Sequence, residues 1–164
     1  MGLVGKMREG IRFAACLLAL LAAQPLKADD DHFYSLINAS AGRIDFADEN
    51  GHMAQKGFVT FTILTVPATG NVGYSLSQVS INCNRAEIAT LENANYASNG
   101  ASLPSQPLDS AVQPIATGTL GQALQAVICK GIDPYPRSKA IKGINAAVSK
   151  AHGLLAALQV PPAK

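Results

Sequence analysis

Tryptophan is absent from the 164 residues, and the aromatic side chains are limited to five Phe and four Tyr. A core must therefore rest on aliphatic and small residues. Also absent are a Gly-x-Ser-x-Gly elbow, a His-Glu-x-x-His pair, a Gly-rich phosphate loop and a Cys-x-x-Cys motif. The usual signatures of serine hydrolases, zinc proteases, nucleotide-binding enzymes and dithiol oxidoreductases are thus missing. We predict no enzymatic activity and no catalytic residue.

The amino terminus has the pattern of an export signal. Basic residues precede an apolar run at 13–23, and Pro25 and the small Ala28 follow it, just before three aspartates. This order is typical of a Sec-type signal peptide, and we predict cleavage between Ala28 and Asp29. Cleavage after Ala23 is the less favoured alternative. A membrane anchor is disfavoured, because eleven helical residues rise only about 16 Å against a hydrocarbon core of roughly 30 Å.

Removal of residues 1–28 changes what the composition implies. Cys16 leaves with the signal segment, and its place inside the apolar run argues against a lipoprotein. Formal charge falls from +2 to −1, so the basic balance of the whole chain does not indicate nucleic-acid binding. The chain that remains after cleavage is of a length that fits one domain. We expect this domain to be periplasmic, secreted or displayed at the cell surface. Cys83 and Cys129 then form an even pair in an oxidising compartment, which predicts a structural disulfide.

The charge of the remaining chain is segregated. Residues 29–109 hold nine acidic and three basic side chains, whereas 110–164 hold six basic and one acidic. In the favoured interpretation the basic tail folds against its own acidic body. The alternative is a basic surface that meets an anionic membrane or polymer.

Histidine positions give only a weak indication of a metal. His52 follows Asp45, Asp48 and Glu49, but metal ligands must converge and be held by surrounding groups, so a solvated acidic turn is favoured. An amino-terminal copper or nickel site needs histidine in third place, whereas His32 is fourth after the predicted cleavage. We therefore predict no metal and no cofactor.

Short strands alternate with turns over the first part of the exported chain. The predicted strands are His32–Ile37, Arg43–Asp48, Phe58–Val66, Val72–Cys83, Glu87–Leu91 and Ala111–Ile115. Their dense β-branched residues and two-residue alternation favour this assignment. Asn50-Gly51 is a hairpin-turn signal, and residues 97–110 have the composition of a loop. Cys83 falls on the apolar face of its strand, where a disulfide partner can reach it.

Two helices are predicted after the strands. Thr119 and Gln122 fit a capping box, and Lys130-Gly131 fits a stop, for a helix that contains Cys129. On an ideal helix Cys129 lies nearly opposite Leu120, so this helix is either enclosed on two sides or unwound before the cysteine. A second helix is predicted over 138–159, beyond a Pro-rich link.

The second helix carries an apolar stripe that includes Ile141, Ile144, Val148 and Leu155. We favour docking of this stripe on its own domain, and a partner or membrane surface is the alternative. The predicted organisation is a signal peptide at 1–28, a sheet with a tethered helix at 29–137, and a C-terminal helix and tail at 138–164 of the same domain.

The order of features resembles the surface-adhesin protein E family of exported proteobacterial proteins. The matching stretch runs from about Phe33 to Cys129 and includes the acidic turn 45–51, Ser80-Ile81-Asn82-Cys83, and Val127-Ile128-Cys129. The resemblance implies an antiparallel sheet with a helix fastened across one face by a disulfide. The chain departs from the family in its helix beyond Pro136 and in lacking a tryptophan-rich start.

Together these features predict an α+β fold: an antiparallel sheet of five or six short strands, a disulfide-tethered helix and an extra C-terminal helix. The favoured function is a non-enzymatic exported module that binds a protein or polymer of the envelope or extracellular matrix. One alternative is a small periplasmic hydrolase or metal-dependent enzyme. The other is a structural accessory that holds a partner with its C-terminal helix.

Overall fold

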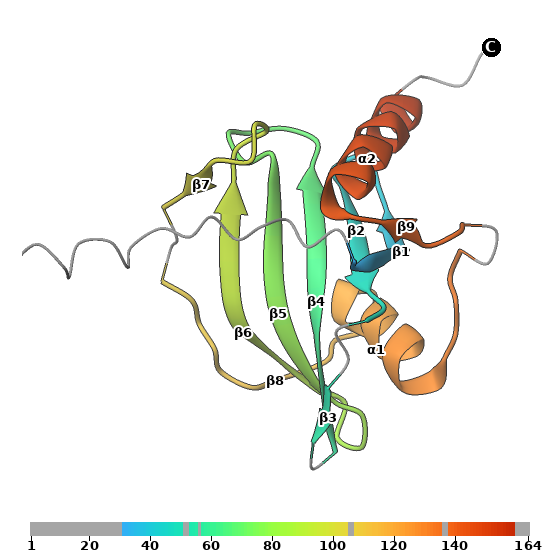
Figure 1. Ribbon diagram of the computed structural model, residues 1–164. Coiled ribbons are helices and arrows are strands. Elements are labelled where there is room, and N and C mark those ends of the chain that lie inside the picture. Colours follow the sequence, from blue (N-terminus) through green and yellow to red (C-terminus); the bar gives the residue numbers. More distant parts are fainter. Residues whose placement is uncertain (1–30, 51–52, 56, 105–106, 136–137, 160–164) are drawn as a thin grey trace, which may run out of the picture.

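The computed structural model describes residues 31–50, 53–55, 57–104, 107–135 and 138–159. The predicted signal peptide, with its cleavage site at Ala28 and Asp29, lies outside the described residues, as do Gly51 and His52. The described part has the predicted α+β architecture, with one antiparallel sheet and two helices (Figure 1).

Nine strands form the sheet in the described part of the chain. They are β1 (Phe33–Ala39), β2 (Arg43–Asp48), β3 (Met53–Gln55), β4 (Phe58–Pro67), β5 (Tyr74–Asn82), β6 (Glu87–Tyr96), β7 (Ser102–Leu103), β8 (Gln113–Pro114) and β9 (Ile141–Lys142). The spatial order is β7-β6-β5-β4-β2-β1-β9, while β3 pairs with β4 and β8 pairs with β6.

The sheet has more strands than the five or six predicted. β3, β7 and β9 contain only two or three residues each, too few to show an alternating pattern in the sequence. The turn signal at Asn50-Gly51 falls partly outside the described residues, since Gly51 is not among them. The predicted strands on either side of it, β2 and β4, do pair antiparallel, and β3, which lies between them in the chain, also pairs with β4. β2 and β3 therefore run in the same direction, both antiparallel to β4.

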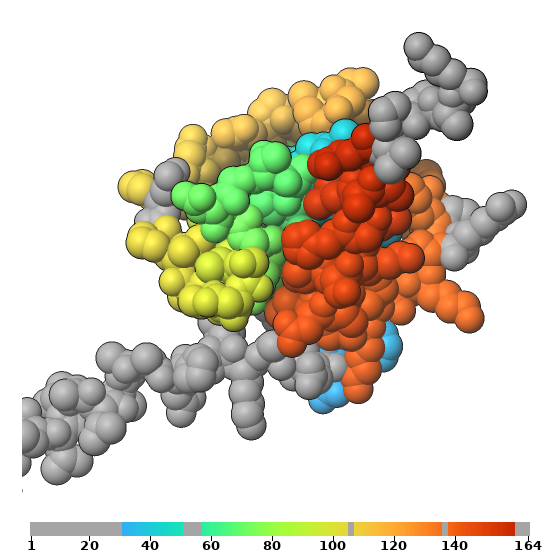
Figure 2. Space-filling model, turned by 90° about the horizontal axis from the view of Figure 1, so that it is seen from above, coloured from blue at the N-terminus to red at the C-terminus, as the bar shows by residue number. Residues whose placement is uncertain are grey.

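Each face of the sheet packs against one helix over part of its area, which explains why β4 carries apolar side chains on both sides. Phe61 and Ile63 join the α1-side core, together with Leu124 of α1 (Leu120–Lys130). Leu64 and Val66 join the α2-side core beneath α2 (Ile144–Gln159). Figure 2 shows α2 in red along one side of the strands and the light-orange chain leading into α1 along the opposite side.

Helix α1 has the predicted ends. Thr119 Oγ1 accepts the N–H of Gln122, and the Gln122 side chain accepts the N–H of Gly118. Gly131 ends the helix at φ 63°, a left-handed conformation that suits glycine. The helix continues through Cys129 without unwinding, because Cys129 packs on the α1-side core.

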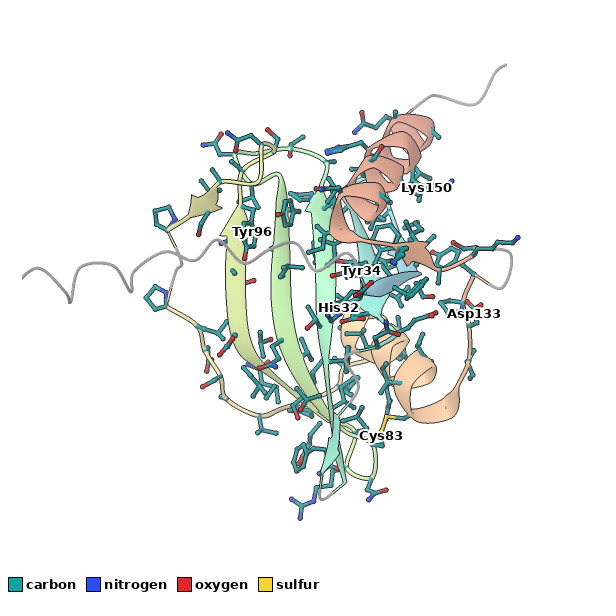
Figure 3. All side chains as sticks on the ribbon, viewed as in Figure 1. His32, Tyr34, Cys83, Tyr96, Asp133 and Lys150 are labelled. Carbon is teal, nitrogen blue, oxygen red and sulfur yellow. A yellow bond between two sulfur atoms is a disulfide. The ribbon has the colours of Figure 1, made fainter. Side chains whose placement is uncertain are left out.

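The predicted disulfide between Cys83 and Cys129 is present, with Cα atoms 5.6 Å apart. It joins the carboxyl end of α1 to the lower end of the sheet (Figure 3). Cys83 lies just beyond β5 and not within it, because Asn82 Oδ1 accepts two backbone N–H groups and turns the chain there. The disulfide therefore fastens the helix at a strand end.

The C-terminal helix begins later than predicted. Ile141 and Lys142 pair with Tyr34 and Phe33 as an edge strand, and Gly143 follows at φ 84°. A residue in that region cannot continue a right-handed helix, so α2 starts at Ile144. Its buried side chains, Ile144, Ala147, Ala151 and Leu155, all face the sheet.

Gly73 lies in close contact with the backbone of the loop after β6. A Cβ placed there would lie 2.4 Å from the backbone nitrogen of Ser98, and the Gly73 N–H donates to the Tyr96 carbonyl at 2.7 Å. The loop after β6 therefore crosses the start of β5 in direct backbone contact. None of the helices in the described part of the chain is long and apolar enough to cross a membrane.

Candidate functional site

A row of polar side chains crosses five strands on the α1-side face of the sheet. Strand register aligns Asn38 of β1, Asp45 of β2, Thr65 of β4, Ser75 of β5 and Asn95 of β6. We call these five residues the polar row. All share a face because side chains two apart on a strand point the same way, and the α1-side core occupies alternate positions of the same strands.

Asp45 is the anchor of the polar row. Its carboxylate is completely buried, yet it accepts hydrogen bonds from Asn38 Nδ2 at 2.8 Å and from Thr65 Oγ1 at 2.7 Å. The guanidinium Nε of Arg43 lies 3.0 Å from Asp45 Oδ2, the oxygen that also accepts the Asn38 hydrogen bond. A buried carboxylate is tolerated when it is paired and hydrogen-bonded in this way. The same contacts hold the side chains of Asn38, Thr65 and Arg43 in fixed positions.

Beside the polar row, the next residues on the same face of β5 and β6 are also polar. Ser77 lies opposite Asn93, and its hydroxyl donates to Asn93 Oδ1 at 2.9 Å. Every row member except Asp45 is half-buried, as are Ser77 and Asn93. A sheet face normally reserved for a core is thus polar and partly open to solvent beyond the area that α1 covers.

A pocket of about 640 Å³ adjoins the β1 end of the polar row. One wall is formed by Gly118, Thr119 and residues along α1 as far as Lys130. The other is formed by Asn38 of β1, Ser40 of the β1–β2 turn and Arg43 of β2. We call this the α1 pocket. Asn38 belongs to both the pocket and the polar row, so the two surfaces are continuous.

The acidic residues considered for a metal do not converge. Asp45 points to the α1 side and Asp48 to the α2 side of β2, as alternation requires, and Glu49 accepts a hydrogen bond from Ser35. In the described part of the chain no three His, Cys, Asp or Glu side chains are placed to hold a metal ion. His52, the fourth member of the proposed patch, lies outside that part.

His32 and Asp48 form a second polar cluster. The His32 Nδ1 contacts Asp48 Oδ2, and the other oxygen of this buried carboxylate accepts the Asn50 N–H at 2.9 Å. His32 is not among the residues that line the α1 pocket. The pair therefore fastens the chain before β1 to the end of β2.

The apolar stripe predicted as a candidate partner surface packs largely on its own domain. Ile144 and Leu155 are buried in the α2-side core, and Val148 is half-buried against it. Ile141 packs against the same core from β9. The favoured interpretation, docking on the chain's own sheet, agrees with these positions.

The polar row was not among the sites predicted from sequence. Its members are spaced irregularly along the chain, from Asn38 to Asn95, and only strand register aligns them. The one available signal was the polar side of β5, where Ser75 and Ser77 precede Val79 and Ile81 on the same face. That change from polar to apolar marks where α1 begins to cover the sheet.

Comparisons of the chain with protein-family models, with curated proteins and with solved structures found no match. The resemblance to the surface-adhesin protein E family therefore stays a prediction. The disulfide suits a protein of an extracellular or periplasmic compartment.

Proposed function

We propose that this chain is an exported, non-enzymatic binding module that recognises a hydroxyl-rich polymer, a polysaccharide of the envelope or extracellular matrix. The observation that carries the proposal is the polar row, which crosses β1, β2, β4, β5 and β6 and is partly open to solvent at every member except the buried Asp45. Its amides and hydroxyls both donate and accept hydrogen bonds, which matches the hydroxyl groups of a sugar chain.

The dimensions of the row suit an extended ligand. Adjacent strands are about 4.8 Å apart, so five strands span about 19 Å. The side chains are also preorganised, since Thr65 and Asn38 are fixed on Asp45 and Ser77 is fixed on Asn93. Groups already held in place lose little conformational freedom on binding, which supports recognition by many individually weak contacts.

The test is binding of the purified chain to soluble polysaccharides, measured by retardation in affinity gels. The panel contains neutral dextran and xylan and acidic alginate, polygalacturonate and heparin. We expect retardation by at least one polymer, and we expect Ser77→Ala combined with Asn93→Ala to weaken it about tenfold. That loss corresponds to one or two hydrogen bonds.

Gln78→Ala is the matched control. Gln78 follows Ser77 on β5, is also half-buried, and points to the opposite face, so its replacement should leave binding unchanged. Equal losses from both variants, or no retardation by any polymer, would reject the proposal. Capture of an envelope protein in place of a polysaccharide by the same row would favour protein recognition instead.

A further inference from the structure

We infer that the α1 pocket binds an anionic substituent of the polymer, a carboxylate or sulfate on the sugar nearest β1. This inference rests on the proposed function and adds a charge preference to it. The pocket adjoins the polar row through Asn38, so a chain lying along the row brings its end residue to the pocket mouth. Its volume of about 640 Å³ falls in the usual range for a small-ligand site.

Arg43 presents donors to this pocket. Its Nε is occupied by Asp45 at 3.0 Å, and that contact holds the planar guanidinium in one orientation. The terminal nitrogens carry the other four N–H donors. Because the Arg43 side chain is 46% exposed, those donors are accessible to a carboxylate or sulfate, which the guanidinium fork fits well.

Lys130 supplies the second positive charge. It is the last residue of α1 and an exposed part of the pocket wall, next to the disulfide at Cys129 that anchors this end of the helix. Among the described residues, Lys130 has no carboxylate partner within ion-pair distance. Its charge is therefore available to a ligand.

The balance of charge around the pocket is positive. Arg43 and Lys130 are the charged residues in its wall, and no carboxylate lines it. Buried Asp45 lies behind Arg43 and compensates one of the two charges. A net single positive charge faces the pocket, which favours one anionic group per binding site.

The experiment compares each acidic polymer with its neutralised form: polygalacturonate with its carboxyl-reduced product, and heparin with heparin that is both desulfated and carboxyl-reduced. The wild-type chain should bind the acidic form about three- to tenfold more tightly, the range expected for partly exposed charge pairs. Lys130→Gln should remove most of this preference by weakening binding of the acidic form. Arg43→Lys, which keeps a charge beside Asp45 but loses the fork, should reduce the preference.

Lys150→Gln is the control, because Lys150 is exposed on α2, away from the pocket (Figure 3). Equal binding of the acidic and neutral forms by the wild-type chain would overturn this inference while leaving the proposed function intact. The same holds if Lys150→Gln removes as much preference as Lys130→Gln. Binding of neither form would overturn both.

Discussion

Thr65 on β4 donates a 2.7 Å hydrogen bond to the carboxylate of Asp45 on β2, a group with no solvent exposure. The pair joins two strands on the face that carries the polar row. Because the Asp45 carboxylate has no exposure to bulk solvent, the contribution of this hydrogen bond to stability should be larger than that of a surface contact.

Thr65→Val tests this contribution. Valine keeps the shape of the side chain but cannot donate, so the free energy of unfolding should fall by about 1.5–3 kcal/mol. Thr62→Val, a half-buried threonine on the opposite face of β4, should change it by no more than about 0.5 kcal/mol. Urea unfolding measures both, and equal effects would contradict the role assigned to Asp45.

Loss of either cysteine of the disulfide should lower the free energy of unfolding by the same amount. Cys83→Ala and Cys129→Ala each open the same 46-residue crosslink and should cost about 4 kcal/mol by chain entropy. The double variant should cost little more, because either change alone removes the bond. Two free thiols in protein isolated from an oxidising compartment would refute the pairing.

Two aspartate substitutions, one on each side of α2, test whether this helix is docked on the sheet. Ala151 is completely buried on the side of α2 that faces the sheet, so Ala151→Asp should lower the free energy of unfolding by more than about 3 kcal/mol through an unpaired buried charge. Ala146→Asp, at an exposed position of the first helical turns, should have an effect within about 1 kcal/mol. If Ala151→Asp melts like the wild-type chain, α2 is not docked.

Stability should decline at alkaline pH through Tyr74. Burial, and secondarily the charge of Tyr96, raise the pKa of the Tyr74 phenol above its ordinary value of 10.0; the two rings stack at 4.7 Å. The folded chain then holds this proton after the unfolded chain has released it, so stability is kept below pH 10 and lost as pH rises through the folded-state pKa. Unfolding of Tyr74→Phe should depend less on pH above 10, and identical slopes would exclude this assignment.

Export makes a direct prediction about the amino terminus. If the segment 1–28 is a cleaved signal, amino-terminal sequencing of exported protein should begin at Asp29. An intact chain that begins at Met1 in the membrane fraction would contradict cleavage and would require the anchor interpretation.

Sequence patterns predicted the elements whose signals are local. Arg43–Asp48 was predicted with its observed ends, and Phe58–Val66 within one residue, because alternation over six or more residues is distinctive. Thr119 and Gly131 fixed the ends of α1 for the same reason, since caps act within one turn.

Features that depend on strand register were not predictable. β9 fell inside a helical apolar stripe, and only its pairing with β1 shows that it is extended. The polar row likewise exists only because Asp45 lies beside Thr65 and Thr65 beside Ser75. A shift of one residue in any pair would turn a side chain to the other face, and no single strand's sequence specifies that alignment.

The backbone contact at Gly73 has a consequence for how relatives of this chain are to be recognised. The nitrogen and Cα of Ser98 occupy the space that any side chain at position 73 would need, and backbone atoms cannot rotate away as a side chain can. Under the proposed function the exposed positions of the polar row can diverge with the ligand, whereas position 73 cannot. A distant homologue that retains the crossing of the two loops will therefore carry glycine there, even where little else of the sequence is shared.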